Sequence, residues 1–140
     1  MTISLPDTNL LLALAWPNHQ FHAQAHAWFA ARGKRGWATC AFTQLGFIRL
    51  SANPAYSPEA VSPQNAAALL QHWTKHKAHH FWNSPAADSP AIYSRALGHQ
   101  QVNDAWLVEV ARKNKGKLVS LDARLSAHAS ESGLVETIIS

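Results

Sequence analysis

The sequence predicts an α/β fold, a three-layer α/β/α sandwich around a parallel sheet of four to five strands. The first observation is that short apolar segments alternate along the chain with longer segments that carry apolar residues at helical spacing. Strands that are separated by helices form parallel sheets with right-handed crossovers. The second observation is size: 140 residues supply one domain with a core and are too few for two, so we expect a single domain over residues 1–140.

Five segments have the short apolar pattern of strands. In the first of them Ile3 and Leu5 flank a serine, which is the alternation of a strand, and Lys117–Leu121 has the clearest pattern of the five. The expected strands cover residues 3–5, 36–40, 78–82, 117–121 and 134–139. In a parallel sheet all of them point the same way, so their carboxyl ends share one edge.

The helical segments are identified by apolar spacing and by their terminal residues. Asn18 is expected to cap the second helix, and Pro63 occupies the favoured first position of the fourth. The segment 53–63 holds three prolines and is expected to be a loop. The expected helices cover residues 10–15, 19–31, 42–50, 63–77, 90–97, a segment that starts at 101 or 103 and continues past 111, and 123–129.

Three histidines are spaced along one helix. His19, His22 and His26 lie at positions i, i+3 and i+7 of the expected second helix. Two histidines at such spacing could hold a metal ion. Histidines exposed to solvent on a helix surface are the more common case, and the sequence leaves both interpretations open.

Composition narrows the setting and the partners. The chain has no run of about 18 apolar residues and no basic N-terminal run before its first apolar stretch, so neither a membrane span nor a secretory signal is expected. Its single cysteine, Cys40, cannot form an internal disulfide, which favours a reduced, cytoplasmic setting. The formal net charge of +4, with only 8 acidic residues, suits a polyanionic partner.

Three of the aspartates are expected at one edge of the sheet. Asp7 and Asp122 directly follow the first and fourth expected strands. Asp104 lies in the first turn of the helix that leads into the fourth strand, and a helix antiparallel to its strand starts at that same edge. Each aspartate alone could be a helix cap or a partner of the helix dipole. Together they form an acidic cluster from positions far apart in the chain.

Such a cluster indicates a particular chemistry. Three carboxylates in one cleft repel each other, which raises their pKa values unless a cation is present. A hard divalent cation, Mg²⁺ or Mn²⁺, relieves the repulsion and prefers oxygen ligands. It also lowers the pKa of a bound water and neutralises charge at a phosphate. The cluster therefore predicts phosphoryl transfer or phosphodiester hydrolysis.

Four motifs carry a resemblance to a known family. In chain order they are Asp7-Thr8-Asn9, the run TQLGFIR over residues 43–49, the run GHQQVNDA over residues 98–105, and the run LVSLD over residues 118–122. This ordered set, which covers essentially the whole chain, resembles the PIN domain and most closely the toxins of the VapC type from toxin–antitoxin pairs. The resemblance implies a Mg²⁺- or Mn²⁺-dependent endoribonuclease. It also implies an RNA substrate, a small cognate antitoxin, a homodimer and a bacterial cytoplasmic location.

The resemblance also implies roles for individual residues. By motif position, Asp7, Asp104 and Asp122 are the metal-binding and catalytic acids, and Ser120 is a hydroxyl beside them. Many PIN domains have a glutamate after the second strand, where this chain has Gln44. An amide carries no charge, so we expect Gln44 to be a neutral hydrogen-bond partner at the site. We also expect one metal ion in the free protein, held chiefly by Asp7 and Asp104.

Basic residues divide by their distance from the acidic edge. The densest run lies at a helix C-terminus on the opposite edge, where it complements the helix dipole. It comprises Arg112, Lys113, Lys115 and Lys117. The basic residues nearer the acids are candidate phosphate contacts. These are Arg49, Arg95, His99 and Arg124.

Other protein classes also gather acids at a sheet edge. A receiver-like phosphoacceptor needs a neighbouring acid pair near the first strand and a late lysine at the same edge, and neither is apparent. A phosphatase of the haloacid-dehalogenase type needs an aspartate at position 9, where this chain has asparagine. A catalytically weakened PIN-like module that binds RNA or protein stays open as the alternative, because Gln44 replaces an acid.

Overall fold

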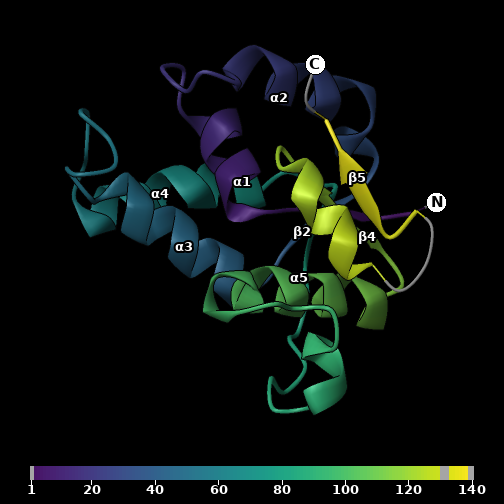
Figure 1. Cartoon of the computed structure of the whole chain (residues 1–140). Coiled ribbons are helices and arrows are strands. Elements are labelled where there is room, and N and C mark those ends of the chain that lie inside the picture. The colour runs from purple at the N-terminus through teal and green to yellow at the C-terminus, as the bar shows by residue number, and fades with distance from the viewer. Residues whose placement is uncertain (1, 130–132, 139–140) are drawn as a thin grey trace.

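The computed structural model of the chain describes residues 2–129 and 133–138 (Figure 1). Its centre is a five-stranded sheet with the order β3-β2-β1-β4-β5, in which every pair of neighbours is parallel. The strands are β1 (Ser4–Pro6), β2 (Trp37–Thr39), β3 (His79–Phe81), β4 (Lys117–Ser120) and β5 (Val135–Thr137). The predicted parallel sheet is confirmed, with five strands.

Helices cover both faces of this sheet. They are α1 (Thr8–Ala15), α2 (His22–Ala31), α3 (Ala41–Ser51), α4 (Pro63–Thr74) and α5 (Val102–Lys113). In Figure 1 α5 lies on one side of the sheet, and α1 and α2 lie on the other. Short 3₁₀-helices cover Gly33–Arg35, Pro90–Tyr93, His99–Gln101 and Ala123–His128. The arrangement is the predicted α/β/α sandwich.

Consecutive strand residues pack on opposite faces of the sheet, which produces the three layers. Leu118 belongs to a buried cluster with Val108 and Ala111 of α5. Val119, the next residue, belongs to a different cluster with Leu10 of α1. Full burial of such a side chain contributes about 1.5–3 kcal/mol. Because both faces are covered, the central strands read as short apolar runs.

The order of the strands creates a switch point between β1 and β4. From β1 the chain continues to β2 and then β3 on one side, whereas β4 and β5 lie on the other side. Pro6 at the end of β1 is paired with Val119 of β4, so the two strands end next to each other. Ligands of open α/β sheets bind outside the carboxyl ends of strands at such a switch point.

The second helix starts later than predicted, and Asn18 does not cap it. α2 begins at His22, and its N-cap is Phe21, which makes no side-chain capping bond. His19 lies in the preceding turn instead, where its Nδ1 accepts the backbone N–H of Phe21 at 3.1 Å. A ring nitrogen thus satisfies a backbone donor before the helix starts, and this bond is not visible in apolar spacing.

His22 and His26 bond to the end of α1, and within the described part of the chain they belong to no group of three His, Cys, Asp or Glu side chains that could hold a metal ion. The His22 Nδ1 lies 2.7 Å from the carbonyl oxygen of Ala13, and the His26 Nε2 lies 2.8 Å from that of Leu14. Both carbonyls belong to the last turn of α1, where helix carbonyls lack partners within the helix. The two imidazoles supply these missing donors, so the arrangement is a structural cap.

Three shorter segments differ from their predicted extents. The helix expected over residues 90–97 is the 3₁₀-helix Pro90–Tyr93, and the one over 123–129 is also a 3₁₀-helix. The last strand ends at Thr137, and the expected strand residue Ile139 lies outside the described residues. Within the described ranges, no helix is long and apolar enough to cross a membrane.

Gly116 lies where the turn before β4 passes close to β1. A Cβ placed there would be 2.4 Å from the Trp82 Cη2 and 2.5 Å from the carbonyl oxygen of Ile3. The carbonyl belongs to the backbone and cannot rotate away. We therefore expect Gly116→Ala to lower the free energy of unfolding by about 1–3 kcal/mol, the usual cost of overpacking. Urea denaturation measures this difference.

Gly98 provides the matched control for this substitution. A Cβ at Gly98 would meet no atom within 4 Å, and the residue is exposed. Gly98→Ala should therefore leave the free energy of unfolding nearly unchanged. Equal stability of the two variants would show that the close approach at Gly116 does not constrain the sheet.

Candidate active site

Asp7 is the most firmly held side chain at the carboxyl edge of the sheet. It follows β1 directly and is the N-cap of α1, where its Oδ1 accepts the backbone N–H of Leu10 at 2.9 Å. Its Oδ2 accepts the hydroxyl proton of Ser120 at 2.6 Å. Only 8% of the residue is exposed. Each carboxylate oxygen therefore has a fixed direction in a nearly water-free position.

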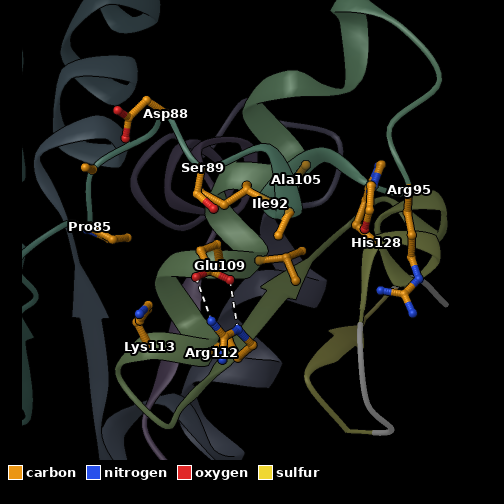
Figure 2. A pocket seen from close by; sticks show the side chains of 14 residues that line it. Pro85, Asp88, Ser89, Ile92, Arg95, Ala105, Glu109, Arg112, Lys113 and His128 are labelled. Atoms are coloured by element: carbon orange, nitrogen blue, oxygen red, sulfur yellow. Dashed lines mark hydrogen bonds and ion pairs between the residues drawn. The ribbon is translucent and has the colours of Figure 1, made fainter.

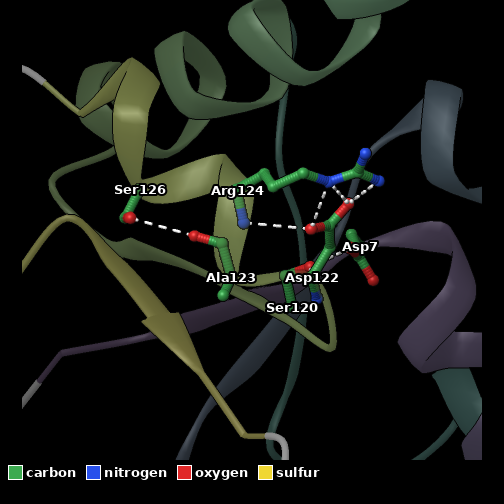
Figure 3. A network of polar contacts seen from close by, with 6 residues as sticks. All are labelled: Asp7, Ser120, Asp122, Ala123, Arg124 and Ser126. Atoms are coloured by element: carbon green, nitrogen blue, oxygen red, sulfur yellow. Dashed lines mark hydrogen bonds and ion pairs between the residues drawn. The ribbon is translucent and has the colours of Figure 1, made fainter.

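Ser120 ties the ends of β1 and β4 together. Its hydroxyl donates to Asp7, and its Oγ accepts the backbone N–H of Asp122 at 2.8 Å (Figure 3). The residue is completely buried. One hydroxyl thus fixes Asp7 and orients the chain segment that carries the second aspartate.

Asp122 is paired with an exposed arginine. Its Oδ1 accepts the backbone N–H of Arg124 at 2.9 Å, and its Oδ2 accepts from the guanidinium Nη2 at 2.8 Å (Figure 3). The hydrogen bonds from Arg124 hold the pKa of Asp122 below its usual range. The Arg124 side chain is 90% exposed, so this pair lies at the mouth of the site.

Asp104 enters the site from α5. It lies in the first turn of that helix, where the dipole favours a carboxylate, and it is half-buried. Burial raises its pKa, and the nearby charge of Asp122 raises it further. His128 and Arg124 act in the opposite direction and lower it.

All three aspartates line one pocket. Its volume is about 750 Å³, and its walls come from the ends of β1 and β4, from α3 and α5, and from the loop after α3. The residues that share the pocket with the acids include Asn9, Leu45, Arg49, Tyr56 and Asn103. Asp7 precedes Asp104 by 97 residues in the sequence, and the fold brings both of them, with Asp122, to the switch point between β1 and β4.

The electrostatics of Asp7 reflect its confinement. Burial raises the pKa of Asp7 from 3.8 to about 6, and the charges of Asp104 and Asp122 contribute to the rise. The hydrogen bonds from Ser120 and Leu10 favour the ionised form and offset part of it. The pocket therefore holds a carboxylate whose negative charge is destabilised, which is a condition that a bound cation relieves.

The chemistry of the acids fits a hard divalent cation, and Arg124 opposes it. The three side chains offer oxygen atoms, which Mg²⁺ and Mn²⁺ prefer. Among the residues that the structure describes, no three His, Cys, Asp or Glu side chains are close enough together to enclose an ion as they stand. The Arg124 guanidinium bonds both oxygens of Asp122. A cation in this pocket therefore competes with Arg124 for Asp122.

Gln44 does not lie at the acid pocket, contrary to the expectation from the family pattern. Its Nε2 donates to the Oγ1 of Thr39 at 3.0 Å, and the residue lines a separate groove between α3 and α4. Successive residues of a helix point about 100° apart. Because Leu45 and Arg49 of α3 face the acids, Gln44 is turned toward α4.

The basic candidates are distributed over three places. Arg49 and Arg124 lie at the acid pocket or bond one of its residues. Arg95 lines another cavity, of about 530 Å³, between α5 and the segment before it. Figure 2 shows Arg95 beside His128 on one side of this cavity, with the bonded pair Glu109 and Arg112 on the other. His99 lies in the 3₁₀-helix before α5, on the exposed surface.

Sequence reasoning missed several residues that border the acid pocket, and Asn9 and Tyr56 are two of them with polar side chains. Asn9 follows Asp7 by two positions in the first turn of α1, and Tyr56 comes from the proline-containing loop. The Tyr56 hydroxyl donates to the Oδ1 of Asn9 at 3.3 Å. The motif Asp7-Thr8-Asn9 could have identified Asn9, because a residue two positions after Asp7 in the first turn of α1 lies close to the site. No local pattern identifies Tyr56, because its position depends on how the loop folds back on α1.

Sequence comparison identifies related proteins over nearly the full chain. The PIN domain family profile matches residues 4–131. The chain is 38% identical over 141 residues to Ribonuclease VapC39 of Mycobacterium tuberculosis, which covers 96% of this chain and 99% of that protein. It is also 38% identical over 125 residues to Ribonuclease VapC38 of the same organism, which covers 86% of each chain.

Solved structures share the fold. The crystal structure of VapC20 from Mycobacterium tuberculosis, described as a sarcin-ricin loop cleaving toxin, matches with a TM-score of 0.69 at 16% identity and covers 97% of this chain and 99% of that one. PAE2754 from Pyrobaculum aerophilum matches with a TM-score of 0.63 at 21% identity, over 96% of this chain and 83% of that one. This chain belongs to the PIN domain family, and its curated relatives are ribonucleases of the VapC type.

Proposed function

We propose that this protein is a divalent-metal-dependent endoribonuclease that acts as the toxin of a VapBC-type toxin–antitoxin pair. The observation that carries the proposal is the pocket at the β1/β4 switch point, where Asp7, Asp104 and Asp122 converge. Burial and mutual repulsion disfavour the charge of Asp7 there. The names of the relatives, which are ribonucleases, support the choice of RNA as substrate.

Five residues in or beside the pocket have a role in this proposal. Asp7, Asp104 and Asp122 would hold Mg²⁺ or Mn²⁺ through their oxygens. When bound, the ion lowers the pKa of a coordinated water and neutralises charge at the scissile phosphate. Ser120 would keep Asp7 in the orientation for binding, and the loss of such a supporting bond commonly costs about 10–100-fold in affinity or activity. Arg49, an exposed cation at the pocket, would contact RNA phosphates.

The proposed partner is a small antitoxin that covers the acid pocket. Unpaired carboxylates bind an arginine side chain through charge-assisted hydrogen bonds, so an inserted arginine can take the electrostatic place of a metal ion. The Arg124–Asp122 pair within this chain already has that chemistry. We expect the antitoxin to present a cationic side chain near Asp7 and Asp104. Assembly as a homodimer stays a prediction.

A catalytically weakened PIN-like module that binds RNA or protein is the second candidate. Two observations favour it. Gln44, which stands where many PIN domains have a glutamate, lies away from the pocket. The guanidinium of Arg124 is hydrogen-bonded to the Asp122 carboxylate, which a metal ion would need. The two candidates differ in one result. The enzyme cleaves RNA when Mg²⁺ or Mn²⁺ is added, whereas the binding module retains RNA or a protein without cleaving.

Substitution of each acid tests the enzyme directly. We expect Asp7→Asn, Asp104→Asn and Asp122→Asn each to lower the rate of metal-dependent RNA cleavage by about 100-fold or more. The reason is that a metal site supplies several kcal/mol of charge stabilisation, and 1.36 kcal/mol is tenfold in rate. Asp88→Asn is the matched control, because Asp88 is exposed and lies outside the acid pocket. Cleavage at the wild-type rate by one of the three variants would remove that residue from the site.

The raised pKa of Asp7 also predicts how stability depends on pH. An acid with a folded pKa of about 6 and an unfolded pKa near 3.8 binds its proton more tightly in the folded state. Asp7 therefore destabilises the folded protein once it ionises: its contribution to the free energy of unfolding falls as the pH rises from about 4 to about 6, and stays low above that. By 1.36 kcal/mol per pKa unit, the cost at neutral pH is about 3 kcal/mol.

Asp7→Asn has no such titration, so its free energy of unfolding relative to wild type should rise by up to about 3 kcal/mol between pH 4 and pH 7. Urea denaturation in EDTA at several pH values measures the difference. A difference that stays flat for Asp7→Asn would mean that burial does not perturb this carboxylate.

A further inference from the structure

A second, smaller cavity adjoins the acid pocket. Its volume is about 280 Å³, near the lower end of the range of roughly 300–1,000 Å³ for small-ligand pockets. It shares Asn9, Leu50 and Tyr56 with the acid pocket, so the two lie side by side. A chain molecule that places a phosphate against the acids can therefore reach this cavity with its neighbouring group.

The lining of this cavity differs in character from that of the acid pocket. Among the described residues that line it there is no Asp, Glu, Lys or Arg. Its lining includes three amide side chains, three aromatic rings and two serines, which are Asn9, Asn18, Gln20, Trp16, His19, Tyr56, Ser51 and Ser57. Amide side chains read the hydrogen-bonding edges of bases, and aromatic side chains stack on unpaired RNA bases. An uncharged lining of this kind fits a nucleobase and does not fit a second phosphate.

The orientation of Asn9 is fixed by two neighbours. The Nδ1 of His19 accepts the N–H of Phe21, so the ring proton of neutral His19 is on Nε2. That Nε2 then donates to the Oδ1 of Asn9, 3.0 Å away, and the Tyr56 hydroxyl donates to the same oxygen. Both acceptor sites of this oxygen are thus in use. The Nδ2 group of Asn9, a donor of two hydrogen bonds, is the part that a ligand can meet.

We propose that this cavity is a nucleobase subsite that holds one base next to the bond cleaved at the acid pocket, with the Asn9 Nδ2 donating to an acceptor on that base. The inference rests on the proposed ribonuclease function. The subsite would give the protein base selectivity, which the acid pocket alone cannot provide, because contacts to phosphate carry no sequence information and contacts to base edges do. A preference for one base at this position follows.

Nucleosides, which carry no phosphate, test the subsite separately from catalysis. Trp16 lines the cavity, and its indole N–H donates to the Oγ of Ser51 at 3.0 Å, so its NMR signal reports on binding there. With EDTA present, we expect titration with the four nucleosides to shift this signal, and the four to differ in affinity. Trp16→Phe identifies the signal among the six tryptophans.

The variants separate the subsite from general effects. Asn9→Ala and Tyr56→Ala should abolish the nucleoside shifts. Asn65→Ala is the matched control, because Asn65 is an exposed asparagine in the first half of α4 and does not line the cavity. Retention of the shifts in both cavity variants, or their loss in Asn65→Ala, would overturn the proposal.

Cleavage of an RNA pool randomised around a single site supplies the second readout. One good base contact discriminates by about 1–3 kcal/mol, so wild type should prefer its best base over its worst by about 5–150-fold at one position beside the cut. In Asn9→Ala and Tyr56→Ala this ratio should fall to about threefold or less, with cleavage still dependent on the metal. Asn65→Ala should keep the wild-type ratio.

The two readouts distinguish failure of the subsite from failure of the enzyme. Nucleoside binding in a protein that cleaves no RNA would refute the proposed ribonuclease function and leave the subsite standing. Metal-dependent cleavage without base preference, together with no nucleoside shifts, would refute the subsite alone. A base preference that Asn9→Ala leaves unchanged would assign the preference to another part of the protein and also refute the subsite.

Discussion

The burial of the Asp7 carboxylate between β1 and α1 is the constraint on which the rest of the site depends. Its two oxygens are held by the N–H of Leu10 and the hydroxyl of Ser120, so it fastens the start of α1 to the end of β4. The same position removes it from water and raises its pKa to about 6. An apolar residue or a serine could pack here without that cost. The fold therefore tolerates a destabilised charge at the point where β1 and β4 diverge, and this is where a cation would have the greatest effect.

The surroundings of Asp7 divide recognition into a charged part and a neutral part. Asp104, Asp122, Arg49 and Arg124 provide charges of both signs at the pocket, which suits a phosphate and its counterion. The adjoining cavity offers amides and rings and no such charge among its described residues. Asn9 borders both parts, and its amide is oriented by contacts that do not involve the acids. A ribonucleotide has the same division, with a charged phosphate beside an uncharged base.

The sequence was sufficient for the fold and for the convergence of the acids because both follow from topology. Because β1 and β4 are parallel, Asp7 and Asp122 lie at the same edge of the sheet, whatever the order of the strands. α5 runs antiparallel to the strands, so its first turn brings Asp104 to that edge too. The position of Gln44 was predicted wrongly because one residue along α3 changes the direction of a side chain by about 100°. The apolar Leu45, 66% exposed, faces the acids instead, which apolar spacing could not indicate. The imidazole bonds of His22 and His26, and the approach of Tyr56, depend on tertiary contacts that no local pattern records.

The proposed activity requires that a divalent ion binds where Asp7, Asp104 and Asp122 converge. Mn²⁺ is paramagnetic, so substoichiometric Mn²⁺ added to the isotope-labelled, RNA-free protein broadens the amide signals nearest its site. We expect the signals of Thr8, Ala105 and Ala123, which adjoin the three acids, to broaden first, ahead of those around Gln44 in the α3–α4 groove. Broadening centred on His22 and His26, or no selective broadening at any site, would contradict it.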